Sequence, residues 1–205
     1  MPLSSALPLT FLLWLAVSSM QATSVVLDNP YVRVNRDAAP CATASPTCVE
    51  RVIVALGATD VRTDGTAKKL IRGQVAVFAE GQSYTVPTGG SYFEVAFKPK
   101  RPPVQSPKDM IPPDKNAIVH DAERFFVFEE RLEPGDTRTR HSHSQRVVVQ
   151  LNKTRLQQWP DGEAELVRDI VPDGVAFNAP VIHVVKNVGE LPLRGIVIEL
   201  KPERR

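Results

Sequence analysis

The sequence predicts an all-β protein made of many short antiparallel strands. Short runs of Val, Ile, Phe and Leu recur along the chain, each bounded by Gly, Pro, Asn or Asp, whereas the spacing typical of an amphipathic helix is scarce. A proline-rich stretch divides the chain, and the segments on its two sides resemble each other. Together these observations favour two small β units in tandem over one large sandwich.

Seven segments carry the strand pattern. Each is rich in β-branched or aromatic residues and is flanked by turn-forming residues. In chain order they are 52–56, 74–78, 92–97, 124–128, 147–151, 181–185 and 195–200. A further strand is assumed over 137–149, the segment that carries two of the histidines.

The repeat rests on two pairs of matching segments. Residues 51–56 (RVIVAL) resemble 146–151 (RVVVQL) at an offset of 95 positions, and 92–99 resemble 195–202 in position and pattern. Between the repeats, residues 98–116 contain six prolines and no strand pattern, which is typical of an extended connector. The expected units are an N-terminal barrel over 25–98, a connector over 99–116 and a C-terminal barrel over 117–205.

The N-terminus has the pattern of a secretory signal. Residues 7–17 (LPLTFLLWLAV) are almost wholly apolar, and the first charged side chain is Asp28. The run is too short to cross a bilayer, which takes about 20 apolar residues, and it has the length of a signal's apolar region. We expect 1–24 to be a signal peptide and the mature protein to be secreted or periplasmic, with no later membrane span. The alternatives are a buried N-terminal helix and a membrane anchor.

Export changes the meaning of the two cysteines. Cys41 and Cys48 enclose six residues rich in Ala, Thr, Ser and Pro. In an oxidising compartment, such a pair most simply forms one disulfide that closes a small loop. A metal-binding pair and two free thiols remain alternatives, although the spacing is not CxxC and no histidine is nearby.

Three of the four histidines fall in a pattern that suits a metal ion. His141 and His143 are two residues apart, and side chains alternate along a strand, so both project from one face. His183 would complete the group from a neighbouring strand. Neutral imidazole binds Zn, Cu, Fe and Ni, and three ligands leave positions open for water or substrate. The residues expected on the opposite face of the strand are Arg138, Arg140 and Arg146.

These residues resemble the two sequence motifs of the cupin family. In the first motif, five residues separate Gly135 from the His141-x-His143 pair. The matching residues of the second motif are Gly174, Pro180, His183 and Asn187. The resemblance covers 116–202 well and 29–98 loosely, and it implies two small jelly-roll β-barrels in tandem, the arrangement of bicupins.

The match to the cupin motifs has three gaps. Ile182 stands where the second motif has a Gly between the Pro and the His. The family's metal-binding Glu would fall at Val147 or Val148, neither of which can bind a metal. Gln145, expected on the histidine face, is the candidate for a weak oxygen ligand in its place. In the first repeat, the positions equivalent to the two motif histidines hold Pro46 and Cys48, so we expect no metal site there.

Two classes of function follow from this pattern. The first is a metal-dependent enzyme with His141, His143 and His183 as ligands for Fe, Mn, Zn, Ni or Cu, dioxygenase-like or isomerase-like in its reaction. No general base is nominated, because the nearest glutamates precede the motif and Glu199 lies on what is expected to be a distant strand. The second is a non-catalytic protein that binds a small molecule or serves a structural role.

The expected partner is a small molecule that the sequence does not identify, and a homodimer is compatible with either class. The net charge of +2 argues against a nucleic-acid partner, because such binding needs a concentrated basic surface.

Overall fold

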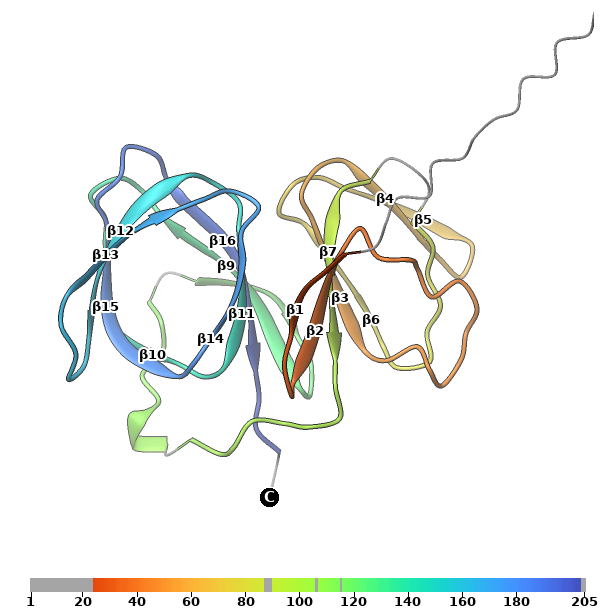
Figure 1. The fold of residues 1–205 in the computed structure, drawn as a ribbon, viewed down its shortest axis with the longest axis horizontal. Coiled ribbons are helices and arrows are strands. Elements are labelled where there is room, and N and C mark those ends of the chain that lie inside the picture. Colours follow the sequence, from red (N-terminus) through yellow and green to blue (C-terminus); the bar gives the residue numbers. More distant parts are fainter. Residues whose placement is uncertain (1–23, 87–89, 106, 115, 204–205) are drawn as a thin grey trace, which may run out of the picture.

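The computed structural model describes residues 24–86, 90–105, 107–114 and 116–203, and it is built from β-strands (Figure 1). The predicted signal peptide, except for Ser24, lies outside the described residues. Within the described part, the chain contains no helix long and apolar enough to cross a membrane.

The first half contains a five-stranded antiparallel sheet in the order β1-β2-β7-β3-β6 and a two-stranded hairpin, β4-β5. The strands of this sheet are β1 (Ser24–Asp28), β2 (Val32–Arg36), β7 (Tyr92–Phe97), β3 (Arg51–Ala55) and β6 (Val75–Phe78). The hairpin consists of β4 (Thr59–Thr63) and β5 (Thr66–Leu70). The loop between β2 and β3 carries a disulfide between Cys41 and Cys48, as predicted.

The second half contains a five-stranded sheet in the order β14-β11-β16-β9-β8 and a four-stranded sheet in the order β10-β15-β12-β13. The strands of the first sheet are β14 (Val175–Asn178), β11 (Arg146–Gln150), β16 (Leu193–Leu200), β9 (Phe125–Leu132) and β8 (Asn116–Asp121). Those of the second are β10 (Thr137–His143), β15 (Val181–Asn187), β12 (Thr154–Pro160) and β13 (Leu166–Ile170).

The two halves repeat one topology. The order β1-β2-β7-β3-β6 becomes β8-β9-β16-β11-β14 when each strand is replaced by its counterpart, and β12-β13 corresponds to the hairpin β4-β5. This arrangement confirms the prediction of an all-β fold with two jelly-roll units in tandem. The sheets of each unit face each other without closing into a continuous barrel.

The two five-stranded sheets pack face to face and share one hydrophobic core (Figure 1). The rings of Phe97 and Phe125 stack across this contact with centroids 4.2 Å apart. Val147 and Val149 of β11 belong to this shared core, whereas Val148, between them, packs with Phe128 inside the second half. Strand alternation therefore divides β11 into one face toward the first half and one face toward the interior of the second.

The expected single strand over 137–149 is wrong. The chain leaves one sheet after His143 and enters the other at Arg146, so β10 and β11 belong to different sheets. A β-bulge between Arg138 and His141 also breaks the alternation. As a result Arg138 is fully buried, whereas the expected alternation pointed it away from the histidine face.

The proline-rich segment does more than connect the two halves. Ser142 N donates a hydrogen bond to Ile111 O at 2.8 Å, and Ile111 N donates one to Ser142 Oγ at 2.7 Å. A short 3-10 helix, η1 (Pro107–Asp109), lies just before this contact. The segment therefore covers the free edge of β10, the strand that carries two of the motif histidines.

Candidate metal centre

Two neighbouring strands bring three histidines together inside the second half. β10 and β15 pair antiparallel, with His141 directly opposite His183 and His143 opposite Val181. The three imidazoles are 0%, 3% and 4% exposed in the order His141, His143, His183. Their ligand atoms all lie within 4.8 Å of one another, so the structure brings together the three histidines that the sequence predicted as ligands.

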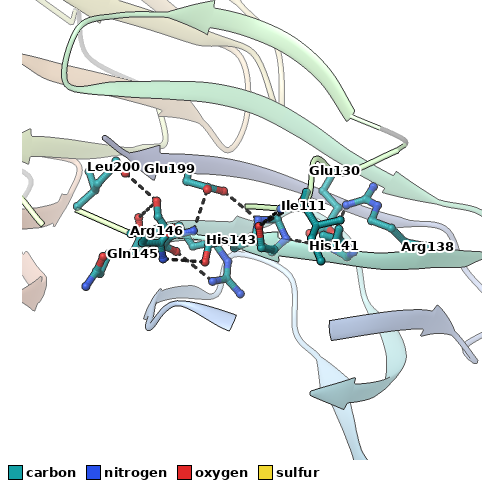
Figure 2. Close-up of polar contacts among 12 residues, drawn as sticks. Ile111, Glu130, Arg138, His141, His143, Gln145, Arg146, Glu199 and Leu200 are labelled. Atoms are coloured by element: carbon teal, nitrogen blue, oxygen red, sulfur yellow. Dashed lines mark hydrogen bonds and ion pairs between the residues drawn. The ribbon is translucent and has the colours of Figure 1, made fainter. Parts of the chain in front are cut away.

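Hydrogen bonds to two of these rings determine which nitrogen faces the centre. His141 Nδ1 lies 2.8 Å from the backbone oxygen of Thr139, and His143 Nδ1 lies 2.9 Å from Glu199 Oε2 (Figure 2). A carbonyl can only accept, so the first contact holds the proton of His141 on Nδ1 and leaves a lone pair on its Nε2. Glu199 does the same for His143 when its carboxyl is ionised. The two Nε2 atoms are 3.0 Å apart and face each other.

Two lone pairs at this distance repel unless a cation lies between them. Two bonds of about 2.1 Å from one metal ion, at a right angle, place their nitrogen atoms about 3.0 Å apart. The side chain of His183 adds a second sign, because neither of its ring nitrogens has a hydrogen-bond partner among the described residues although both are buried. Buried polar atoms without partners are rare in native proteins, and here a bound metal ion would satisfy them.

The imidazoles are neutral at physiological pH. Burial lowers the pKa of His143 to about 3 and that of His183 to about 2, and it also lowers the pKa of His141. A metal ion must compete with protons for a nitrogen lone pair. Because these pKa values are low, all three nitrogens are available as ligands at pH 7.

Glu199 supplies a carboxylate that the sequence reasoning placed elsewhere. It was expected on a distant strand, but β16 pairs directly with β11 and places Glu199 opposite Arg146. Glu199 shares the interior face of β16 with Val197 and reaches His143 from behind the ring. Its Oε1 also accepts a hydrogen bond from Ser144 N at 2.8 Å. Burial raises the pKa of this carboxyl to about 7.

Glu199 does not replace the missing family ligand, because it contacts Nδ1 of His143 and not the side where the three rings meet. It is instead a carboxylate that orients a ligating imidazole and increases its basicity. One sequence signal could have indicated it: an acidic residue inside the apolar strand 195–200, which needs a buried polar partner.

Of the three arginines expected to point away from the histidines, only one does so. Arg140 is exposed and pairs with Asp161, as expected. Arg138 instead lies inside the second half, where its Nη1 donates to Glu130 Oε1 at 2.7 Å. Arg146 shares the interior face of β11 with Val148 and is 8% exposed.

Gln145 does not join the histidines. It lies between β10 and β11, beyond Ser144, and its side chain points away from the imidazoles (Figure 2). Asn187 of the second motif has a structural role, because its Nδ2 donates hydrogen bonds to the backbone oxygens of Leu132 and Leu191. Gly135 adopts a φ of 83°, which explains a glycine at that turn.

In the first half, the Cys41–Cys48 disulfide lies at the position along the chain that corresponds to the histidine pair of the second half. The Cys41–Cys48 loop runs directly into β3, as β10 leads into β11 in the second half. Within the described part of the chain, His141, His143 and His183 make up the one group of three or more metal-binding side chains.

The fold has clear relatives among solved structures. The chain is similar to a putative glyoxylate-induced protein from Pseudomonas aeruginosa, with a TM-score of 0.60 and 13% identity over 90% of this chain and 80% of that one. It is similar to a cupin 2 conserved barrel protein from Leptotrichia buccalis, with a TM-score of 0.55 and 12% identity over 88% of each chain.

A third relative is an oxalate decarboxylase from Lactobacillus farciminis, with a TM-score of 0.56 and 11% identity over 85% of this chain and 78% of that one. No protein-family model and no curated protein matches the sequence. The likeness therefore lies in the three-dimensional structure, and it shows that the chain shares the fold of these proteins, one of which is a cupin 2 barrel.

Proposed function

We propose that the second half binds one divalent transition-metal ion through His141, His143 and His183, and that the protein acts on a small molecule at this centre. The observation that carries the proposal is the pair of Nε2 atoms 3.0 Å apart, in two rings whose Nδ1 atoms are each engaged on the far side by an oxygen. The candidate ions are Fe, Mn, Zn, Ni and Cu, because all of them accept imidazole ligands.

A bound ion of this kind supplies Lewis acidity and, if it is iron or copper, redox chemistry. The chain's own residues orient the imidazoles and keep water from them. Thr139 O and Glu199 hold the tautomers of His141 and His143, and Phe128 covers the His143 ring with centroids 6.1 Å apart. The burial of all three rings excludes bulk water from the ligand atoms.

For the reaction, we propose a dioxygenase-like or isomerase-like activity, as three protein ligands leave coordination positions for a substrate. The alternative is a non-catalytic protein that binds a small ligand. One observation favours this alternative: the group consists of three imidazoles without a carboxylate ligand, so less negative charge offsets the ion than in the family's usual site. One of the similar structures is an oxalate decarboxylase, but at 11% identity it supports the fold alone.

We also propose that the protein works outside the cytoplasm, in the periplasm or as a secreted protein. The Cys41–Cys48 disulfide supports this location, because disulfides persist in oxidising compartments. The apolar segment 7–17, with the pattern of a signal peptide, supports it independently.

Metal analysis tests the proposed centre. The purified protein is incubated in turn with Fe, Mn, Zn, Cu and Ni, desalted and analysed for bound metal beside a His141→Ala, His143→Ala double variant and a His120→Ala control. His120 lies on β8 and stacks on Phe125, away from the cluster. We expect one ion per chain in the parent and the control and none in the double variant. A parent that retains none of the five metals would refute the proposal.

A further inference from the structure

We propose that Arg146 binds a carboxylate group of a small ligand inside the second half, next to the three histidines. This inference rests on the proposed function only in placing the ligand at the same centre. It concerns the chemical class of the molecule that the centre receives, which is a small carboxylate.

The position of Arg146 follows from the strand pattern. Arg146 and Val148 lie on the same face of β11, and Val148 packs with Phe128 and Val197 inside the second half. The guanidinium therefore enters the same interior as the imidazoles. Its positive charge lowers the pKa values of both His143 and His183, in agreement with this placement.

The charge of Arg146 is buried without a carboxylate partner. The side chain is 8% exposed, and among the described residues its Nη1 donates only to two backbone oxygens, at 3.3 Å to Ser144 and 2.9 Å to Ala179. No described carboxylate oxygen lies within 4.0 Å of its guanidinium nitrogens. Its neighbour in register, Glu199, is engaged by His143 and Ser144 instead.

The first half provides an internal comparison. Arg51 occupies the equivalent position at the start of β3, at the repeat offset of 95. It is also buried, at 6% exposed, but its Nη1 lies 3.7 Å from Glu94 Oε2. The half without a histidine cluster thus neutralises this arginine with its own carboxylate, whereas the half with the cluster does not. An unpaired buried charge is costly, which points to a partner from outside the chain.

A second arginine adds positive charge to the same interior. Arg168 of β13 is partly buried and donates Nε and Nη2 to the amide oxygen of Gln158, at 3.2 and 3.0 Å. It too has no carboxylate within 4.0 Å among the described residues. Because Gln158 is neutral, neither arginine has a carboxylate in direct contact; Glu130 acts on both, and Glu199 on Arg146, from beyond 4.0 Å. A divalent ion at the histidines would add further positive charge. A neutral ligand would leave this charge unmatched, whereas a carboxylate would match it.

A surface pocket gives a route to this position. Its volume is about 290 Å³, and it is lined by the connector residues Gln105 and Asp109, by Ser142 and His143 at the end of β10, and by 180–182. Ala179, whose oxygen accepts from Arg146, directly precedes this lining segment. The pocket therefore reaches the edge of the cluster at His143, and its lining begins one residue after the carbonyl that accepts from Arg146. Asp109, which also lines the pocket, is exposed to solvent.

Binding of acetate, compared with uncharged acetamide of the same shape, tests this proposal. Dissociation constants are measured by NMR titration at constant ionic strength, on metal-free protein and on protein loaded with Zn²⁺. In the metal-free protein we expect acetate to bind at least about tenfold more tightly than acetamide, because a hydrogen bond to a charged group contributes more than a neutral one. Equal affinities for the two molecules would overturn the proposal.

Two variants locate the binding group. Arg146→Gln should weaken acetate binding about tenfold or more, whereas Arg140→Gln, which removes an exposed arginine of β10, should leave it unchanged. Unchanged acetate affinity in a folded Arg146→Gln protein would also overturn the proposal. If that variant does not fold, the acetate-induced shift of the Arg146 Nε–H resonance in the parent decides, and the proposal fails if the shift is absent.

These measurements distinguish a failure of the carboxylate site from a failure of the metal centre. Protein that retains none of the five metals but prefers acetate to acetamide would refute the metal centre and keep the carboxylate site. Protein that binds Zn²⁺ at the histidines but, when metal-free, does not distinguish acetate from acetamide would do the reverse.

Discussion

Glu199 Oε2 lies 2.9 Å from Nδ1 of His143, on the side of the ring opposite the histidine cluster. The carboxylate comes from β16 and the imidazole from β10, two strands in different sheets. This contact joins the two sheets of the second half at the candidate metal centre. It fixes the tautomer that turns Nε2 toward His141, and most of the predictions below follow from that arrangement.

Removing the charge of Glu199 should weaken metal binding without abolishing it. Glu199→Gln keeps an acceptor for His143 Nδ1 but removes the carboxylate that increases the basicity of the ring, and we expect about tenfold lower affinity. Glu199→Ala removes both and should cost up to about 100-fold. Competition with a coloured chelator measures these affinities, with the exposed Glu133→Gln as control. Parent-like affinity in both Glu199 variants would show that the contact plays no part in binding.

The stability of the metal-free protein should fall as the pH is lowered from 6.5 toward 4. The pKa values of His143 and His183, about 3 and about 2, lie far below the free value of 6.5, so in this range the unfolded chain takes up protons that the folded protein does not. The carboxyl of Glu199 acts in the opposite sense, because its pKa is raised from 4.5 to about 7 and the folded protein holds its proton longer. Two imidazoles outweigh one carboxyl.

Urea unfolding at pH 7, 6 and 5 measures this effect. Each net proton taken up on unfolding changes the free energy of unfolding by about 1.4 kcal/mol per pH unit. We expect a shallower slope in His183→Gln and an unchanged slope in His120→Ala. A parent protein with the same stability at all three pH values would contradict the neutral, buried state of the histidines.

Arg72 should prove important for the contact between the two halves. It lies in the loop between β5 and β6 of the first half, yet its Nη2 donates to Asp173 Oδ1 at 2.6 Å and its Nε donates to Leu151 O at 3.2 Å, both in the second half. Arg72→Ala removes these hydrogen bonds between the halves and should lower the free energy of unfolding by about 1–3 kcal/mol. Thermal unfolding beside the exposed Lys69→Ala control measures the loss, and equal stability of the two variants would contradict the assignment.

The disulfide should contribute stability through a short loop. Cys41 and Cys48 are seven positions apart, and closing a loop of this size stabilises a folded protein by about 2.5 kcal/mol in the chain-entropy treatment. A Cys41→Ser, Cys48→Ser double variant should lose about that amount in urea unfolding. Thiol titration of the denatured parent checks the bond itself, and two free thiols in periplasmic material would contradict it.

The apolar strands of this fold, and the histidines that follow a family motif, were predictable from the sequence. Strands such as β11 and β16 contain three consecutive buried Val or Ile residues, so their pattern is visible without a structure. β5 (TAKKL) and β13 (LVRDI) were missed, since their side chains are mostly exposed and their charged residues hide the alternation. The three histidines were found because their spacing is local and because it matches the motif.

Other features of the site depend on contacts between distant segments, which periodicity does not reveal. The bulge that buries Arg138 changes the face of one residue without changing the sequence pattern. Glu199 reaches His143 only because β16 lies beside β11, a pairing of residues more than fifty positions apart. Gln145 was misplaced for a similar reason, as the chain changes sheet between β10 and β11 and the alternation ends there.

Anomalous X-ray scattering from crystals of the metal-loaded protein tests the central claim most directly. The account predicts a single strong peak per chain within about 2.0–2.2 Å of a ring nitrogen of each of His141, His143 and His183, with Nε2 as the ligand atom of the first two. Nδ1 of His143 should remain on Glu199. A peak located elsewhere, or metal-soaked crystals with no anomalous density among the three rings, would contradict it.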